Sequence, residues 1–256
     1  MTRRRFYAPP AAFAPDGAAV VLSPEESRHL REVLRLRPGD EAFVFDGEGR
    51  EFACVVEEAG GRGSREARLA VRGEAEPLRP ESPLELTLAA GLLKGEKFDL
   101  VVQKATELGV ARVVAVLTKR ADVRLRDERD AAARLERWRR LALEAAKQSG
   151  RARLPAIEPP AAFNDFVSRH APAGALRLLF AERGGRGLDA TIKEMPPMPS
   201  SACALIGPEG GWDDAELEEA RRRGWLLVTL GGRTLRAETA ALTVAALLQH
   251  RFGDLR

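Results

Sequence analysis

The sequence predicts an α/β protein in two parts: a strand-rich module, then a parallel sheet covered by helices. Short segments that alternate apolar and polar residues fill the first part. In the second part, apolar strands alternate with amphipathic helices. Between the two, residues 76–83 hold three prolines, which favour an extended linker. We therefore place a domain boundary after residue 76, with one domain at 1–76 and a second at 77–256.

The first part is expected to contain one helix followed by three strands. Ser23 can cap the helix, Pro24 suits its first turn, and Glu26 completes a capping box. The expected buried stripe of this helix is Leu30, Val33 and Leu34. The expected strands are 41–45, 51–57 and 65–72, separated by glycine-rich turns at 46–49 and 60–63. A strand-rich module of this size is more typical of a small barrel than of an isolated sheet.

The second part alternates strand and helix patterns to its end. The expected strands are 84–89, 112–117, 176–181, 202–206 and 225–230. The expected helices are 96–108, 129–148, 213–222 and 239–251. Because strands joined through helices run in the same direction, this alternation predicts a parallel sheet with both faces covered.

Composition and spacing argue against several classes of protein. No window approaches ~18 consecutive apolar residues, and the basic start has no apolar segment after it, so we expect no membrane helix and no secretory signal. Cys54 and Cys203 lie far apart, which argues against a disulfide framework and fits a reducing cytoplasm. His29, His170 and His250 stand alone, so we expect no metal site. The Walker A, G-x-G-x-x-G and G-x-S-x-G motifs are absent, which argues against NTP hydrolysis, a standard dinucleotide fold and an α/β-hydrolase.

Two glycine-rich turns stand out in the second part. Residues 205–212 and 230–240 each leave an expected strand and enter an expected helix. Ligands of open α/β sheets bind beyond the carboxyl ends of the strands, and glycine lets a ligand approach the backbone. The two loops could enclose one ligand, although each taken alone could equally be a tight turn between a strand and a helix.

The sequences of these two loops closely resemble those of the SPOUT superfamily of RNA methyltransferases. More narrowly, it resembles the RsmE family, which methylates N3 of a uridine in small-subunit (16S) rRNA. Besides the Gly-Pro-Glu-Gly-Gly and Leu-Gly-x-Arg-x-Leu-Arg-x-Glu-Thr-Ala loops, three further stretches are similar to the family. They are Arg4–Tyr7 with His29–Asp40, Leu93–Gly109 and Glu144–Arg151. The resemblance covers nearly the whole chain.

This resemblance implies a PUA-like β-barrel followed by a SPOUT α/β domain with a parallel sheet and a C-terminal trefoil knot. It also implies S-adenosyl-L-methionine as methyl donor, and a homodimer with active sites beside the subunit interface. The cofactor is then expected in the knot. By similarity, the residues that bind it are Leu179, Phe180, Gly207, Glu209, Gly210, Gly211, Leu230, Gly231, Leu235, Arg236, Thr239 and Ala240.

The implied reaction sets the candidate catalytic residues. The N3 proton of uridine is weakly acidic, so its loss needs a cation near the base or a proton acceptor. Arg236 is the candidate cation, because a guanidinium stays protonated and could stabilise charge on the uracil oxygens. Glu209 or Glu238 could accept the proton. Both glutamates have a structural alternative: Glu238 could cap the last helix, and Glu209 could bind neighbouring amides.

An RNA substrate requires positive charge, and the chain concentrates it. Residues 119–153 hold twelve basic and six acidic groups, a net +6 against +3 for the whole chain. A solvated helix face is the alternative interpretation of this segment. The candidate RNA contacts inside and outside it are Arg3, Arg4, Arg5, Lys97, Lys104, Arg120, Arg124, Arg126, Arg151 and Arg153. The expected partner is 16S rRNA or the small ribosomal subunit.

Two other functions remain open at this point. The SPOUT fold also supports 2′-O-ribose methylation of RNA, and a barrel with an arginine-rich helix could bind RNA without catalysis. The intact glycine loops and Arg236 favour an enzyme over a binding protein.

Overall fold

The computed structural model describes residues 3–61, 66–169, 174–193 and 199–255. The chain forms two compact units: unit 1 comprises Met1–Glu81 and Ala146–Leu154, and unit 2 comprises Ser82–Ala145 and Pro155–Arg256. His170, residues 62–63 of an expected turn and Arg65 of an expected strand lie outside the described residues. Within the described ranges, no helix is long and apolar enough to cross a membrane. The same ranges hold no cluster of metal-ligating side chains.

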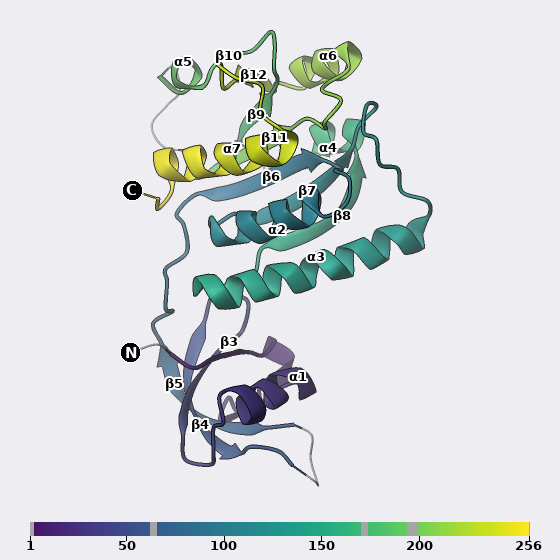
Figure 1. Cartoon of the computed structure of the whole chain (residues 1–256). Helices are drawn as coiled ribbons and strands as arrows, with labels where there is room; N and C mark the ends of the chain where they lie inside the picture. Colours follow the sequence, from purple (N-terminus) through teal and green to yellow (C-terminus); the bar gives the residue numbers. More distant parts are fainter. Residues whose placement is uncertain (1–2, 62–65, 170–173, 194–198, 256) are drawn as a thin grey trace. The chain divides into compact units, whose positions relative to one another are not determined.

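Unit 1 is built on a mixed five-stranded sheet that curls around its own core (Figure 1). The strand order is β1 (Arg5–Tyr7), β3 (Glu41–Phe45), β4 (Glu51–Glu58), β5 (Arg68–Ala75) and β2 (Ala19–Val21). Strands β1 and β3 are parallel, and the other pairs are antiparallel. Phe6, Leu22, Leu30 and Leu69 are fully buried inside it. The alternating pattern of the sequence therefore forms the half-barrel of a PUA-like module.

The α-helix that the sequence predicts in unit 1 is short, and it continues as a wider π-helical turn. After the 3₁₀ turn η1 (Pro10–Ala12), helix α1 covers only Pro24–Arg28, and a π-helical turn, η2 (His29–Val33), follows it. Ser23 Oγ accepts a hydrogen bond from the Glu26 backbone N–H at 3.2 Å, as a helix cap does. Leu30 is buried, but Val33 is 64% exposed, so the expected stripe is wrong at Val33. The wider π turn rotates Val33 off the buried side.

Unit 2 is a seven-stranded, fully parallel sheet. Its strand order is β10 (Arg186–Gly187), β12 (Leu226–Thr229), β9 (Leu176–Phe180), β11 (Ser201–Ile206), β6 (Glu85–Gly91), β7 (Arg112–Leu117) and β8 (Ala156–Ala162). Its helices are α2 (Lys97–Glu107), α3 (Glu128–Ser149), α4 (Phe163–Arg169), α5 (Leu188–Lys193), α6 (Asp214–Arg222) and α7 (Ala237–Phe252). From β6 the chain runs outward through β7 to β8, at one edge of the sheet. It then crosses to β9, and β9 to β12 build the other half. This reversal of strand order is where ligands bind in open α/β sheets.

Each face of the sheet in unit 2 has its own core. Leu86 and Leu88 of β6 pack with Phe98 of α2 and Val244 of α7 on one face. Ala89, the next residue of β6 after Leu88, packs on the other face with the residues beneath α4 and α6. Because successive residues of a strand point to opposite faces, a strand buried on both faces reads as a continuous apolar run. The chain therefore forms the doubly covered parallel sheet that the sequence predicts.

Several elements are absent from the sequence prediction: β1, β2, β8, β10, α4 and α5. Strand β8 contains Pro159 and Pro160, which argue against a strand in the interior of a sheet. It lies at the edge of the sheet, where proline is tolerated. The others span two to seven residues, too few to show a period.

Burial makes a testable prediction about the two cysteines. Cys54 and Cys203 are both buried, and burial raises the pKa of each thiol to about 12. Only the thiolate attacks a disulfide reagent, so neither cysteine should react with Ellman's reagent in the native protein at about pH 8. Both should react after unfolding in guanidinium chloride. One rapidly reacting thiol in the native protein would contradict the burial described here.

Candidate active site

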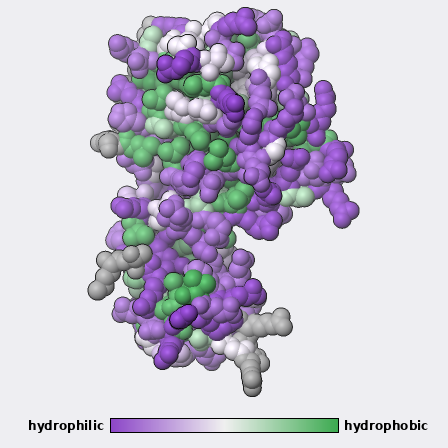
Figure 2. Space-filling model, in the orientation of Figure 1, coloured by the Kyte–Doolittle hydropathy of each residue, from purple (hydrophilic) through white to green (hydrophobic). Residues whose placement is uncertain are grey.

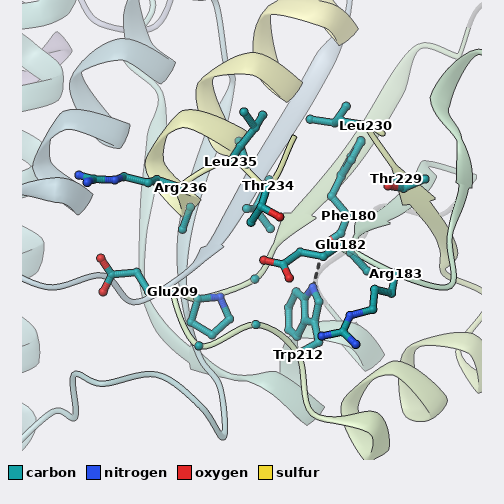
Figure 3. A pocket seen from close by; sticks show the side chains of 18 of the residues that line it. Phe180, Glu182, Arg183, Glu209, Trp212, Thr229, Leu230, Thr234, Leu235 and Arg236 are labelled. Carbon is teal, nitrogen blue, oxygen red and sulfur yellow. Dashed lines mark hydrogen bonds between the residues drawn. The ribbon is translucent and has the colours of Figure 1, made fainter. Parts of the chain in front are cut away.

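A pocket of about 780 Å³ lies beyond the carboxyl ends of β9, β11 and β12 (Figure 3). Three loops line it, at residues 180–183, 206–214 and 229–237, and Lys97 and Arg120 add to the lining. This volume is in the ordinary range for small-molecule sites. The two glycine-rich turns of the sequence therefore face each other across one cavity.

Three apolar side chains line the part of the pocket beside β9. Phe180, Leu230 and Leu235 contribute hydrophobic surface to its lining. The Trp212 indole N–H donates a hydrogen bond to the Phe180 carbonyl oxygen at 2.8 Å, drawn as the dashed line in Figure 3. Trp212 is buried, so this bond fixes the second loop to the end of β9. Glu182 reaches into the same region, between Trp212 and Thr234.

Close backbone packing explains two of the glycines in and beneath this loop. A Cβ placed on Gly207 would lie 3.0 Å from the indole nitrogen of Trp212. On Gly91, at the end of β6, it would lie 2.7 Å from the backbone nitrogen of Pro208. A side chain at Gly91 would overlap the backbone of Pro208, and one at Gly207 would require the buried Trp212 indole to move. The loop after β11 is thus held against the sheet by contacts that need glycine.

Gly210 packs against the backbone of a neighbouring loop and does not face an open part of the pocket. Its Cβ would lie 2.7 Å from the backbone oxygen of Arg120, in the loop that follows β7. A branched residue at Gly210 would therefore displace that loop. A substitution at this position tests loop packing before it tests ligand binding.

Asp213 joins the loop after β11 to the loop after β7. Its carboxylate caps α6 by accepting from the Ala215 N–H, and Glu216 bonds back to the Asp213 N–H to complete a capping box. Lys119 Nζ lies 3.1 Å from Asp213 Oδ1. This ammonium group, together with the Ala215 N–H, lowers the pKa of Asp213 below its ordinary value. Glu216 also accepts from the Lys119 backbone N–H at 2.8 Å, which doubles the connection.

Two of the three candidate catalytic residues lie at the end of the pocket away from Trp212. Figure 3 shows Arg236 and Glu209 at this end, with both side chains extending away from Trp212. Glu209 forms an ion pair with Lys97 Nζ, at the start of α2. Arg236 is exposed at the N-terminus of α7, and the described residues provide it with no carboxylate partner. Cations and a carboxylate thus share the wall of one cavity.

Glu238 lies apart from these residues. It belongs to the first turn of α7 but does not line the pocket. Its Oε2 atom is buried and has no hydrogen-bond partner among the described residues. The N-cap of α7 has no side-chain hydrogen bond, so Glu238 does not cap this helix in the way its alternative interpretation requires.

Most of the residues expected to bind the cofactor come together in the pocket. The lining includes Phe180, Gly207, Glu209, Gly210, Gly211, Leu230, Gly231, Leu235, Arg236 and Ala240. Two expected residues do not line it: Leu179 is fully buried in the sheet, and Thr239 is exposed on α7. Leu179 points to the opposite face from Phe180 because side chains alternate along a strand.

Sequence reasoning missed several residues of the lining. They include Glu182, Arg183 and Trp212. Arg233 and Thr234 lie within residues 230–240, the second of the two loops expected to enclose a ligand. Trp212 had a visible signal, since it directly follows the glycine-rich turn and precedes the α6 cap. Glu182 and Arg183 lie in the loop just after β9, and no other feature of the sequence marks them.

The candidate RNA contacts divide by exposure. Arg5 is 9% exposed and pairs with Glu51 at 2.9 Å, and Arg151 is 5% exposed and pairs with Glu81 at 2.7 Å. Their burial in unit 1 argues against the RNA contacts expected of them, because their guanidinium groups already bind carboxylates. Arg3 also pairs with Glu51, at 3.0 Å, whereas Arg4 and Arg153 are exposed.

The candidates of unit 2 are more accessible. Val123 and Leu125 pack against the core of unit 2. Arg124 and Arg126 alternate with them along the chain, and both are exposed to solvent. Arg126 has a long contact of 3.8 Å to Asp130 and an 85% exposed side chain. The remaining candidates are paired: Lys97 with Glu209, Lys104 with Glu107, and Arg120 with Asp213.

Comparison with known proteins gives consistent matches over both units. A family model described as an RNA methyltransferase domain matches residues 80–249, and one described as an RNA methyltransferase PUA domain matches residues 22–65. The ribosomal RNA small subunit methyltransferase E of Synechocystis is 33% identical over 90% of this chain and 72% of its own length. The chain belongs to this methyltransferase family.

Other members agree with that assignment. The ribosomal RNA small subunit methyltransferase E of Mycobacterium tuberculosis is 34% identical, over 88% of this chain and 84% of its own length. The crystal structure of the same enzyme from Neisseria gonorrhoeae, bound to S-adenosyl methionine, superposes with a TM-score of 0.85. That structure is 32% identical and covers the whole of both chains. The family fold thus extends over both units of this methyltransferase.

The connection through Asp213 predicts a specific loss of stability. Asp213→Ala removes a helix cap and the partner of Lys119, so the melting temperature should fall by roughly 2–4 °C. Asp214→Ala is the matched control, because Asp214 is exposed and has no such partner among the described residues. The pKa of Asp213 is lowered in the folded state, so its stabilisation is present above about pH 4. The difference between wild type and Asp213→Ala should shrink as the pH falls through the folded pKa. Equal melting temperatures for all three proteins at neutral pH would refute the connection.

Proposed function

We propose that this protein transfers a methyl group from S-adenosyl-L-methionine to N3 of a uridine in small-subunit (16S) rRNA. Acting on ribosomal RNA, it would work in the cytoplasm. The observation that carries the proposal is the composition of one pocket. Apolar side chains and glycine-rich loops line one end, and Arg236 with the Lys97–Glu209 pair lines the other. The first suits a nucleoside cofactor, and the second suits a base that loses a proton.

The residues of the pocket fit S-adenosylmethionine. Phe180, Leu230 and Leu235 offer apolar surface for an adenine ring. Gly231 and Gly232 each have φ near +70° and open space where a side chain would be, which leaves the backbone accessible. The Glu182 carboxylate, directed into the pocket, suits the positive charges of this cofactor. When bound, the cofactor supplies an electrophilic methyl group.

The other end of the pocket addresses the acidity of the uridine N3 proton. As the proton leaves, negative charge spreads over N3 and the two flanking carbonyl oxygens. The Arg236 guanidinium remains positively charged and has donors to place on such an oxygen. Glu209 is the proposed proton acceptor, because it lines the pocket and Glu238 does not. Lys97 holds the Glu209 carboxylate in place through their ion pair.

A trefoil knot around this pocket stays a prediction from the family resemblance, and so does the homodimer. Figure 2 shows apolar residues gathered on the face of unit 2 that carries α7. Leu247 of α7 is 40% exposed, and Leu242 and Ala246 of the same helix are half-buried. Helix α7 is therefore apolar on more of its surface than its own unit covers. We propose that a second copy of the chain covers this face.

Cofactor binding tests the first part of the proposal. Trp212→Phe removes the indole hydrogen bond that fixes the loop, so calorimetry should show S-adenosylmethionine binding weakened roughly five- to tenfold. Trp225→Phe is the control, since the Trp225 indole also donates to a buried carbonyl, that of Val167, at 3.1 Å. Trp225 lies outside the pocket lining and should leave the affinity unchanged. Equal losses in the two variants would show that the effect is general destabilisation.

Kinetics separate the catalytic and RNA-binding roles. Arg236→Ala should lower kcat by on the order of 10²–10³ with little loss of RNA affinity, because its charge acts on the transition state. Arg233→Ala, an exposed arginine of the same lining, is the control.

The double variant Arg124→Ala with Arg126→Ala should keep kcat at saturating RNA. Its plot of log affinity against log salt should flatten by about 1.4–1.8 units. A wild-type kcat for Arg236→Ala at saturating RNA would contradict its catalytic role. An unchanged salt slope in the double variant would contradict RNA binding by Arg124 and Arg126.

The oligomeric state tests the face of α7. Light scattering should give twice the chain mass of 27.9 kDa at micromolar concentration. Leu247→Glu should shift the protein toward monomer, because it places a charge in the proposed interface. Leu226→Glu, at a similarly exposed leucine on β12, should leave the dimer intact. A wild-type monomer would contradict the proposal.

A further inference from the structure

The pocket of unit 2 carries more positive than negative charge. Its lining includes five basic residues, which are Lys97, Arg120, Arg183, Arg233 and Arg236. It also includes three acidic residues, Glu182, Glu209 and Asp214, so the lining has a net charge of +2. S-adenosylmethionine adds a positive charge on its sulfonium sulfur, whereas the product S-adenosylhomocysteine has a neutral sulfur there. A pocket with only this net charge would repel the methyl donor and retain the product.

Two of the three carboxylates have their charge offset by neighbouring groups. Glu209 forms an ion pair with Lys97 Nζ. Asp214 lies in the first turn of α6, where the backbone N–H groups of the helix end favour a negative charge. Glu182 differs from both, because it is exposed and forms no hydrogen bond or ion pair with any described residue. Its negative charge is therefore available to a ligand in the pocket.

The Glu182 carboxylate lies between the two ends of the pocket. It extends from the loop just after β9. Figure 3 shows it between Trp212 and Thr234, pointing toward the end that holds Arg236 and Glu209. In S-adenosylmethionine the sulfur joins the adenosyl group to the methyl group that is transferred. With the adenine at the apolar end and the uridine beside Arg236, the sulfur falls in the region that Glu182 reaches.

The sulfonium is the charge of the cofactor that the reaction removes. When N3 of the uridine takes the methyl group, the electron pair of the S–CH₃ bond returns to sulfur, and the N3 proton passes to Glu209. Sulfur is then a neutral thioether, and its attraction to a carboxylate is lost. The α-ammonium group of the cofactor is present in donor and product alike, so a carboxylate that binds it gives no selectivity between the two.

We propose that Glu182 faces the sulfonium group and makes the pocket select the cationic methyl donor over its neutral product. The inference rests on the proposed function only in taking the occupant of the pocket to be S-adenosylmethionine. Because the positive charge on sulfur decreases as the methyl group leaves, Glu182 contributes binding and selectivity and does not accelerate the transfer. The product leaves more readily than it would from a pocket without this carboxylate.

Calorimetry on the full-length protein without RNA tests this selectivity with three ligands. They are S-adenosylmethionine, S-adenosylhomocysteine and sinefungin, which carries an ammonium group in place of the sulfonium. Glu182→Gln keeps the size of the side chain and removes its charge. It should weaken S-adenosylmethionine and sinefungin roughly three- to tenfold, because solvent screens part of an exposed charge. The affinity for S-adenosylhomocysteine should change by less than about twofold.

Asp214→Asn is the matched control, because it removes one negative charge from the same lining. It should leave the ratio of donor to product affinity unchanged, since the helix end already offsets that charge. Equal weakening of donor and product in Glu182→Gln would assign Glu182 to the α-ammonium group and overturn the proposal. Unchanged affinities in Glu182→Gln would overturn it too. So would a loss of the same size, confined to the donor, in Asp214→Asn.

The same measurements separate this inference from the proposed function. A wild-type protein that shows the selectivity but methylates another atom, or none, would refute the proposed function and support the role of Glu182. Methyl transfer to N3 together with equal losses of donor and product in Glu182→Gln would overturn this inference alone. A wild-type protein that binds neither ligand would refute both.

Discussion

The hydrogen bond from the Trp212 indole to the Phe180 carbonyl holds the site together. It connects the loop after β11 to the end of β9, and the pocket exists because these two segments and the loop after β12 meet there. The surrounding contacts hold the same loop in place. Gly207 packs under the indole, Gly91 under Pro208, and Asp213 bonds to Lys119. A buried, fully paired polar group in a close-packed setting has one favourable arrangement, so the loops have little freedom to close the pocket.

The arrangement also explains how charge is distributed over the chain. Many arginines serve the fold: Arg5 and Arg151 are buried in ion pairs and stabilise unit 1. Others are exposed with few or no acidic partners, at Arg236 beside the pocket and at Arg124. Pairing therefore separates structural from functional arginines better than position in the sequence does. A net charge of only +3 conceals this division, because it records only that 38 acidic residues offset 41 basic ones.

The sequence is informative where a period or a turn is strongly specified. The strand Arg112–Leu117 is predicted at its observed bounds because it is a continuous apolar run bounded by polar residues. Asp213 and Glu216 similarly mark the start of α6. Prediction was wrong for Val33 because a π turn leaves no signature in a pattern read at 3.6 residues per turn. The return of Ala146–Leu154 to unit 1 could not be foreseen, since it depends on tertiary contacts such as Arg151 with Glu81. Trp212 directly follows the Gly-Pro-Glu-Gly-Gly motif, but only the structure shows what its indole binds.

The central claim is that this pocket directs methyl transfer to N3 of a uridine in small-subunit rRNA. The most direct measurement is mass spectrometry of nucleosides from small ribosomal subunits incubated with the protein and isotopically labelled S-adenosylmethionine. The account predicts one labelled product, N3-methyluridine, at a single position. Label on the ribose 2′-oxygen, or no label under conditions where the cofactor binds, would contradict it.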